Sequence, residues 1–255
     1  MKRAAFLGIV LIIAVPATAD DWSIERFQWS GSTKSGAAIE IVNQHGDVRT
    51  RSSGINEIEV LANIQHAPGD PYEAVVQISD ETTPFAIDVE WKLREGAAAG
   101  DSTPGMAKRR VDLTVIVPRT SELTVRTATG LVEAKGHGAA VVAESASGDI
   151  RVSTEGKVSA RTERGTIDAV LSRVDRTKSS TFETTTGDIT VWLPADAAVT
   201  VEAETRGVIS TDYSIEIRHD ETDSRKIATA TIGGGGPQLK IQTIRGQVRL
   251  FRTPK

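Results

Sequence analysis

A glycine-centred repeat runs through most of this chain and constrains its fold more than any other feature of the sequence. Between Ser121 and Thr211, strand-like segments alternate with tight turns that end in glycine. These glycines are Gly130, Gly148, Gly165, Gly187 and Gly207, in steps of 18, 17, 22 and 20 residues, with turns of the same type at Gly46 and Gly246. A spacing held near 20 residues predicts units that stack and bury their apolar faces on one another.

Residues at fixed offsets from these glycines repeat their chemical type. Two residues after each glycine stands a β-branched aliphatic residue: Val48, Val132, Ile150, Ile167, Ile189, Ile209 and Val248. Five residues before stand Ile41, Val125, Ala143, Ala160, Phe182 and Ile241, while Glu202 breaks the column because its repeat is one residue short. Alternation with a period of two on both sides of a turn indicates paired strands with one buried face.

These columns predict an all-β, single-domain β-solenoid, a parallel β-helix-like stack of glycine-turn repeats with hairpin insertions. The alternative is an ordinary sandwich of hairpins, which does not normally hold such columns in register. A polar column supports stacking, because small polar groups at a corner can hydrogen-bond to each other or to the turn backbone. Its members are Asn43, Thr127, Ser145, Thr162, Thr184 and Thr243, with Thr205 in this place in the short repeat.

Charged residues form two further columns on the opposite strand face. Four residues before successive glycines stand Arg126, Glu144, Arg161 and Glu183, and three after them stand Glu133, Arg151 and Asp168. In a parallel stack with strands about 4.8 Å apart, opposite charges would face each other along both columns. We expect these charges to set the register of the strands.

The first 19 residues resemble a secretory signal peptide. Lys2 and Arg3 form a basic start, residues 4–15 an apolar core, and residues 17–19 the small-residue pattern Ala-Thr-Ala. The apolar run is short for a membrane span, so we expect cleavage after Ala19 and one β-strand-repeat domain over residues 20–255. Removing Lys2 and Arg3 changes the formal net charge from −4 to −6, which argues against a nucleic-acid partner.

The pattern of the remaining residues also predicts strands and turns. Further strands are predicted over 72–78, 85–93, 111–117, 213–218 and 226–232, and a flexible loop over 95–104. The aromatic residues Trp22, Phe27 and Trp29 are expected to cover one open end of the stack, where unpaired edges would otherwise promote aggregation.

The sequence offers no clear catalytic or metal-binding constellation. The chain has no cysteine, so it lacks disulfides, and its four histidines are not at metal-ligand spacing. Asp47, Asp149 and Asp188 follow turn glycines and could suggest calcium, but the nonapeptide of calcium-binding β-rolls is absent. Residues 233–236 are four glycines without a following Lys-Ser/Thr, which favours a turn over a phosphate loop. We predict no catalytic, cofactor-binding or metal site.

The alternative is a polysaccharide lyase or hydrolase, because such enzymes need carboxylates, or Asp with Arg or Lys, clustered in one groove. Asp149, Arg151, Asp168 and Asp188 could approach one another on adjacent repeats. Alternating charges on a solvated sheet face would give the same pattern.

Several stretches resemble a bacterial group of exported β-strand-repeat proteins that carries the label "putative adhesin", or domain of unknown function. They are residues 115–130 (VIVPRTSELTVRTATG), 186–194 (TGDITVWLP) and 233–237 (GGGGP). The resemblance spans roughly residues 36–252 and rests on glycine turns and strand-ending prolines. It implies a non-enzymatic, adhesin-like binding or structural module of the cell envelope, located in the periplasm, at the cell surface or outside the cell. The implied partner is an unidentified protein or a surface glycan.

Overall fold

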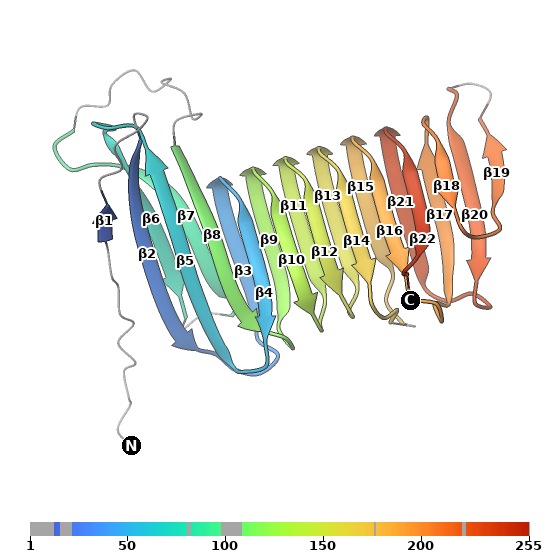
Figure 1. The fold of residues 1–255 in the computed structure, drawn as a ribbon, viewed down its shortest axis with the longest axis horizontal. Helices are drawn as coiled ribbons and strands as arrows, with labels where there is room; N and C mark the ends of the chain where they lie inside the picture. The colour runs from blue at the N-terminus through green and yellow to red at the C-terminus, as the bar shows by residue number, and fades with distance from the viewer. Residues whose placement is uncertain are drawn as a thin grey trace.

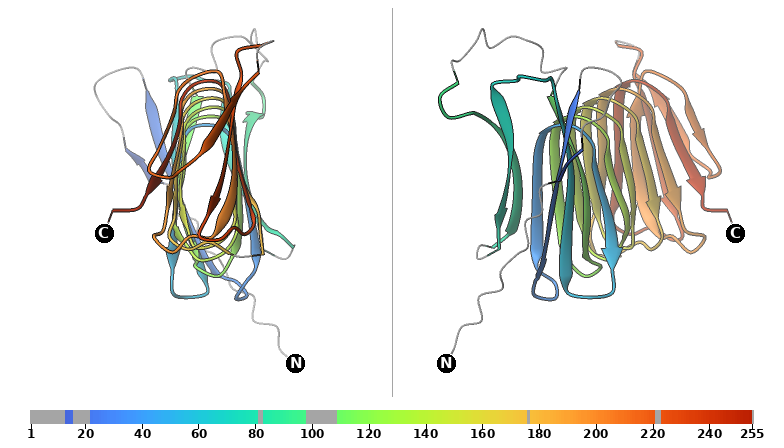
Figure 2. Two further views of the ribbon diagram at one scale, coloured as in Figure 1. Left: turned by 90° about the vertical axis from the view of Figure 1, so that its right-hand side faces the viewer. Right: turned by 60° about the vertical axis from the view of Figure 1, so that its left-hand side comes forward.

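Two long β-sheets face each other in the computed structural model of this chain, which describes residues 13–15, 22–80, 83–97, 109–175, 177–220 and 223–254. All regular elements of these residues are strands, and each sheet contains eleven of them (Figure 1). The view along the stack in Figure 2 shows the sheets as two facing layers joined by turns at both edges. The prediction of an all-β fold is therefore confirmed.

We call the two sheets sheet A and sheet B. Sheet A contains, in spatial order, β1 (Ile13–Val15), β2 (Ser23–Ser32), β5 (Glu57–His66), β8 (Arg109–Pro118), β4 (Val48–Ser53), β10 (Val132–His137), β12 (Ile150–Thr154), β14 (Ile167–Leu171), β16 (Ile189–Leu193), β22 (Val248–Arg252) and β18 (Ile209–Thr211). Sheet B contains β19 (Glu216–His219), β20 (Lys226–Ile232), β17 (Val199–Thr205), β21 (Gln238–Arg245), β15 (Ser180–Thr186), β13 (Val158–Arg164), β11 (Val141–Ser147), β9 (Glu122–Thr129), β3 (Ala38–His45), β7 (Phe85–Leu93) and β6 (Tyr72–Ser79).

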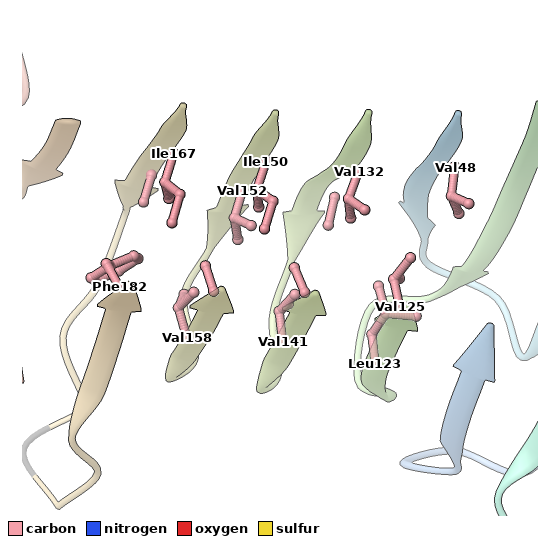
Figure 3. Packing of buried hydrophobic residues seen from close by; sticks show 14 of the residues in the cluster. Val48, Leu123, Val125, Val132, Val141, Ile150, Val152, Val158, Ile167 and Phe182 are labelled. Carbon is pink, nitrogen blue, oxygen red and sulfur yellow. The ribbon is translucent and has the colours of Figure 1, made fainter. Parts of the chain in front are cut away.

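Each glycine turn joins one strand of sheet B to one strand of sheet A, and we call this pair of strands a rung. Neighbouring rungs pair in parallel in both sheets, as in β11 with β13 and β12 with β14. The predicted columns lie in register, so that Val132, Ile150, Ile167 and Ile189 stand opposite one another along sheet A. These four side chains are fully buried between the sheets, where Figure 3 shows three of them, Val132, Ile150 and Ile167, facing Val125, Val141, Val158 and Phe182.

The spatial order of the last rungs differs from their order in the sequence. The C-terminal strands β21 and β22 lie between the rung of Gly187 and the rung of Gly207. Because the Gly207 rung is short, with only three residues in β18, it fits the end of the stack, where Ile209 is only partly buried. The strand before Gly207 is also one residue short. Ala203, and not Glu202, therefore takes the apolar column position and pairs with Ile241.

Antiparallel strands extend both ends of the stack. At one end β5 and β2 continue sheet A beyond β8, and β6 continues sheet B beyond β7. Trp29 of β2 is buried there against Phe85, with ring centroids 5.6 Å apart, so the early aromatic segment does lie at an end of the stack. At the other end β20 and β19 extend sheet B. Both strands were predicted, although residues 213–215 precede β19 rather than belong to it.

The glycine corners of neighbouring rungs lie very close together. A Cβ atom placed on Gly148 would lie 1.9 Å from the carbonyl oxygen of Gly130, and one on Gly165 would lie 2.1 Å from that of Gly148. The same contact continues through Gly187, Gly246 and Gly207. Only glycine lets the backbones approach this closely.

The polar column binds the same carbonyl groups. Thr162 Oγ1 donates to the Gly148 carbonyl at 3.0 Å, and Thr184 Oγ1 donates to the Gly165 carbonyl at 3.1 Å. The equivalent bond to the glycine carbonyl of the neighbouring rung is made by Thr127, Ser145, Thr243 and Thr205. Asn43 Nδ2 donates instead to the Val111 carbonyl of the neighbouring strand β8. The predicted corner ladder is thus confirmed, and its acceptor is the backbone of the neighbouring rung.

The charged columns also have the predicted neighbours. Glu144 stands between Arg126 and Arg161, and Arg151 stands between Glu133 and Asp168. Arg126 Nε lies 3.0 Å from Glu144 Oε2, and its guanidinium also pairs with Glu40. Arg126 and Glu144 are about half exposed, so their pair contributes little to stability but disfavours a slipped register.

The Gly148→Ala substitution tests the corner contact. We expect it to lower the free energy of unfolding by about 3 kcal/mol or more, because the new methyl group would overlap the Gly130 carbonyl backbone. The matched control is Gly54→Ala, where a Cβ would meet no atom within 4 Å. Denaturant unfolding measures both variants, and equal stability of the two would contradict the role of the corner.

The Glu144→Arg substitution tests the charged column. It places a third arginine between Arg126 and Arg161, so we expect the melting temperature at low ionic strength to fall by a few degrees, equivalent to about 1 kcal/mol. Adding Arg161→Glu, or raising the salt concentration, should restore part of this loss. A variant that melts like the wild type at low salt would show that the column does not set register.

Candidate binding surfaces

The acidic residues that follow the turn glycines serve the backbone. Asp47 Oδ1 accepts from the Leu131 N–H at 3.1 Å, and Asp149 Oδ1 accepts from the Thr166 N–H at 2.8 Å. Asp188 Oδ1 likewise accepts from the Gln247 N–H at 2.9 Å. Each aspartate therefore links two rungs. Across the described ranges, no group of three or more His, Asp or Glu side chains is placed to hold a metal ion.

The four residues of the enzyme hypothesis lie on neighbouring rungs but do not form a cleft. Arg151 and Asp168 stand opposite each other on the outer face of sheet A. Asp149 is bound to the backbone, and Asp188 pairs with Arg249 at 3.1 Å. None of the four lines the groove described next.

A groove of about 1080 Å³ lies along the edge opposite the glycine corners. Its lining residues come from the connecting turns between rungs and from residues 172–175, 177 and 178 of the longer connection between β14 and β15. Charged side chains of both signs line it: Glu122, Glu155, Asp175, Asp196, Lys157, Arg173 and Lys178. The periodic pattern did not reveal this groove, although the irregular step of 22 residues between Gly165 and Gly187 marks the connection that makes it.

Two of the groove carboxylates are held by neighbouring groups. Glu155 pairs with Arg119 at 2.5 Å. Asp175 accepts from the hydroxyl and the N–H of Thr177, at 2.7 and 2.9 Å, and these bonds lower the pKa of its carboxyl. A wall of fixed carboxylates and nearby cations suits a polar ligand better than an apolar one.

A buried histidine lies inside the stack near this edge. Gly136, with φ at +77°, forms a bulge in β10 that turns His137 inward, opposite Thr154. His137 Nε2 lies 2.9 Å from Thr50 Oγ1, and its Nδ1 has no hydrogen-bond partner among the described residues. Burial lowers the pKa of His137 to about 4, with smaller contributions from Arg119 and Arg51. The imidazole is therefore neutral at pH 7.

A buried carboxylate lies on the outer face of the same strand. Glu133 is only 7% exposed and pairs with Arg51 at 2.5 Å and Lys135 at 2.6 Å. Burial raises the pKa of Glu133, but the hydrogen bonds from Lys135 and Arg51 outweigh it and hold the pKa below its ordinary value. The sequence pattern placed Glu133 in an exposed column, whereas two cations from neighbouring positions cover it.

Fold and surface together define an all-β protein of two long, parallel-rich sheets with repeating corners. The chain belongs to the Toastrack DUF4097 family, whose model matches residues 87–250. The resemblance to a family of unknown function is thereby confirmed. The part of the chain that the structure describes contains no helix with the length and hydropathy that a membrane crossing requires.

Comparison with solved structures finds similar proteins from bacteria. One is described as a "putative cell adhesion protein" from Clostridium sporogenes, with a TM-score of 0.46 and 12% identity, covering 89% of this chain and 99% of that one. Another is described as a "putative adhesin" from Bacteroides fragilis, with a TM-score of 0.29 and 10% identity, covering 89% and 97%. Comparison with curated proteins finds no match.

His137 should make stability depend on pH. Between about pH 6.5 and 4 the unfolded chain binds more protons than the folded one, so the free energy of unfolding should fall with decreasing pH, by about 3 kcal/mol over this window. Urea unfolding at several pH values measures this slope. His137→Gln should flatten it, and His219→Gln, on the exposed strand β19, is the control for losing one histidine. An unchanged slope in His137→Gln would contradict the assignment.

Proposed function

We propose that this chain is an exported, non-enzymatic β-solenoid that acts as an adhesin-like binding or structural module of the cell envelope. The partner is a protein or a surface glycan held against the outer faces and the groove. The observation that carries the proposal is the use of the turn carboxylates: Asp47, Asp149 and Asp188 accept backbone hydrogen bonds between rungs. Carboxylates engaged in this way hold the stack together and are not free for acid–base chemistry.

The parallel pairing of successive rungs supports the solenoid part of the proposal. Each rung buries its apolar side chains against its neighbours and leaves its outward residues free to vary. Such a body is long and rigid, and it presents charged groups at a spacing fixed by the strands. Rigid, repeating polar surfaces favour recognition of extended partners.

A second candidate is a carbohydrate-active enzyme that uses the groove. Four carboxylates line it, Glu122, Glu155, Asp175 and Asp196, and a glycoside hydrolase requires a pair of carboxylates. These are not the residues that the sequence pattern suggested. Glu155 and Asp175 are already bound by Arg119 and Thr177, which favours the binding module over the enzyme.

Fractionation of the native host tests export and envelope association together. We expect the mature chain to begin at Asp20 by mass spectrometry and to sediment with envelope material. A variant that lacks residues 2–19 should remain in the cytoplasm and serves as the control. Residues 1–12 and 16–19 of the expected signal peptide lie outside the described residues. An intact Met1 in the membrane fraction would show that the segment is an anchor, and a cytoplasmic wild-type protein would overturn the envelope role.

A further inference from the structure

Two aromatic side chains lie next to each other on the outer face of sheet A. Trp192 of β16 and Phe251 of β22 are directly opposite in the parallel register. Val191 and Leu193 on either side of Trp192 are buried, so Trp192 points outward, where it is partly exposed. The two ring centroids are 5.2 Å apart, and the ring planes make an angle of 46°.

This pair differs from the same positions on the other rungs. The outward column to which it belongs contains, in spatial order, Arg51, Lys135, Ser153, Val170, Trp192 and Phe251. Half of the column is polar, and the aromatic residues are confined to two adjacent rungs. The core does not need them, because Val191 and Leu250 already fill the inner face of these rungs. Partly exposed aromatic side chains outside the core offer apolar contact area to a ligand.

Polar groups border the two rings. Asp188 pairs with Arg249 at 3.1 Å, and Arg249 also donates to Gln247 Oε1 at 2.8 Å. Arg249 stands two residues before Phe251 along β22, so these polar groups can exchange hydrogen bonds with a ligand, and the ion pair leaves little net charge beside the rings.

We infer that Trp192 and Phe251 form a platform for a neutral, extended, β-linked hexose glycan. Aromatic faces pack against the apolar C–H face of a sugar ring, while the polar border suits its hydroxyl groups. The ring spacing is fixed by the distance between neighbouring strands, and it is close to the length of one β-1,4-linked hexose unit. Two rings are too small a patch for a stable protein interface, which needs about 800 Å² per partner. The inference rests on the proposed function and names its ligand class.

Titration with cellohexaose and chitohexaose tests the platform, with maltohexaose, an α-linked and coiled hexamer, as the ligand control. We expect the two β-linked hexamers to bind saturably in calorimetry and to change the tryptophan fluorescence. Trp192→Thr and Phe251→Thr should each weaken binding by at least about tenfold. Ile244→Thr, at an exposed apolar position on sheet B, is the matched control and should bind like the wild type. Thermal melting verifies that each variant is folded, and Trp192→Phe should retain part of the affinity.

Each remaining outcome overturns the inference. If neither β-linked hexamer binds the wild type, or if maltohexaose binds equally well, the platform is not a site for such glycans. If the threonine variants bind like the wild type and only melt earlier, the ring pair merely stabilises the sheet. In both cases the envelope association measured by fractionation would still stand, so failure of this site is distinguishable from failure of the proposed function.

Discussion

The contact between glycine corners is the constraint on which the rest of the structure depends. Each corner Cα lies so close to the carbonyl of the neighbouring corner that a side chain at Gly148 or Gly165 would overlap it. This approach brings each glycine carbonyl within reach of the next rung, where a small polar side chain such as Thr162 donates to it. At the same corners, a turn aspartate accepts a hydrogen bond from the residue that follows the neighbouring glycine, as Asp149 does from the Thr166 N–H. Backbone groups that would be left unpaired at a sharp corner are thereby satisfied.

The residues that stabilise the stack are different from those on its outer surface. The inward columns supply the buried area, and the corner residues supply the hydrogen bonds between rungs. Outward positions are therefore free to differ from rung to rung, from the charged pair Arg126–Glu144 on sheet B to the rings of Trp192 and Phe251 on sheet A. In a parallel stack, equivalent outward residues of neighbouring rungs lie one strand spacing apart.

Departures from the repeat mark the features that the regular pattern does not explain. The Gly136 bulge in β10 buries His137 as a neutral imidazole. Residues 172–175, 177 and 178 of the long connection between β14 and β15 line the groove. The antiparallel strands β2, β5, β6, β19 and β20 extend the two ends, which a purely parallel stack would leave as open edges. Function on this scaffold is therefore expected where the repeat is interrupted or where its outward residues change character.

The sequence by itself determined the rung: the all-β class, the buried columns, the corner ladder and the charged neighbours all follow from period-two alternation around glycine, which is a local property. The tertiary structure alone decided what depends on contacts between distant segments. The strand Glu57–His66 was not predicted, and the insertion of Gln238–Arg252 between the Gly187 and Gly207 rungs reverses the order of the last repeats. Local periodicity says which residues face inward, but not which strand edge a returning segment will pair with. In the sequence, only the shortness of the Gly207 repeat indicates this spatial order. A rung with fewer strand residues buries less surface, so it is better placed at the end of the stack than in its middle.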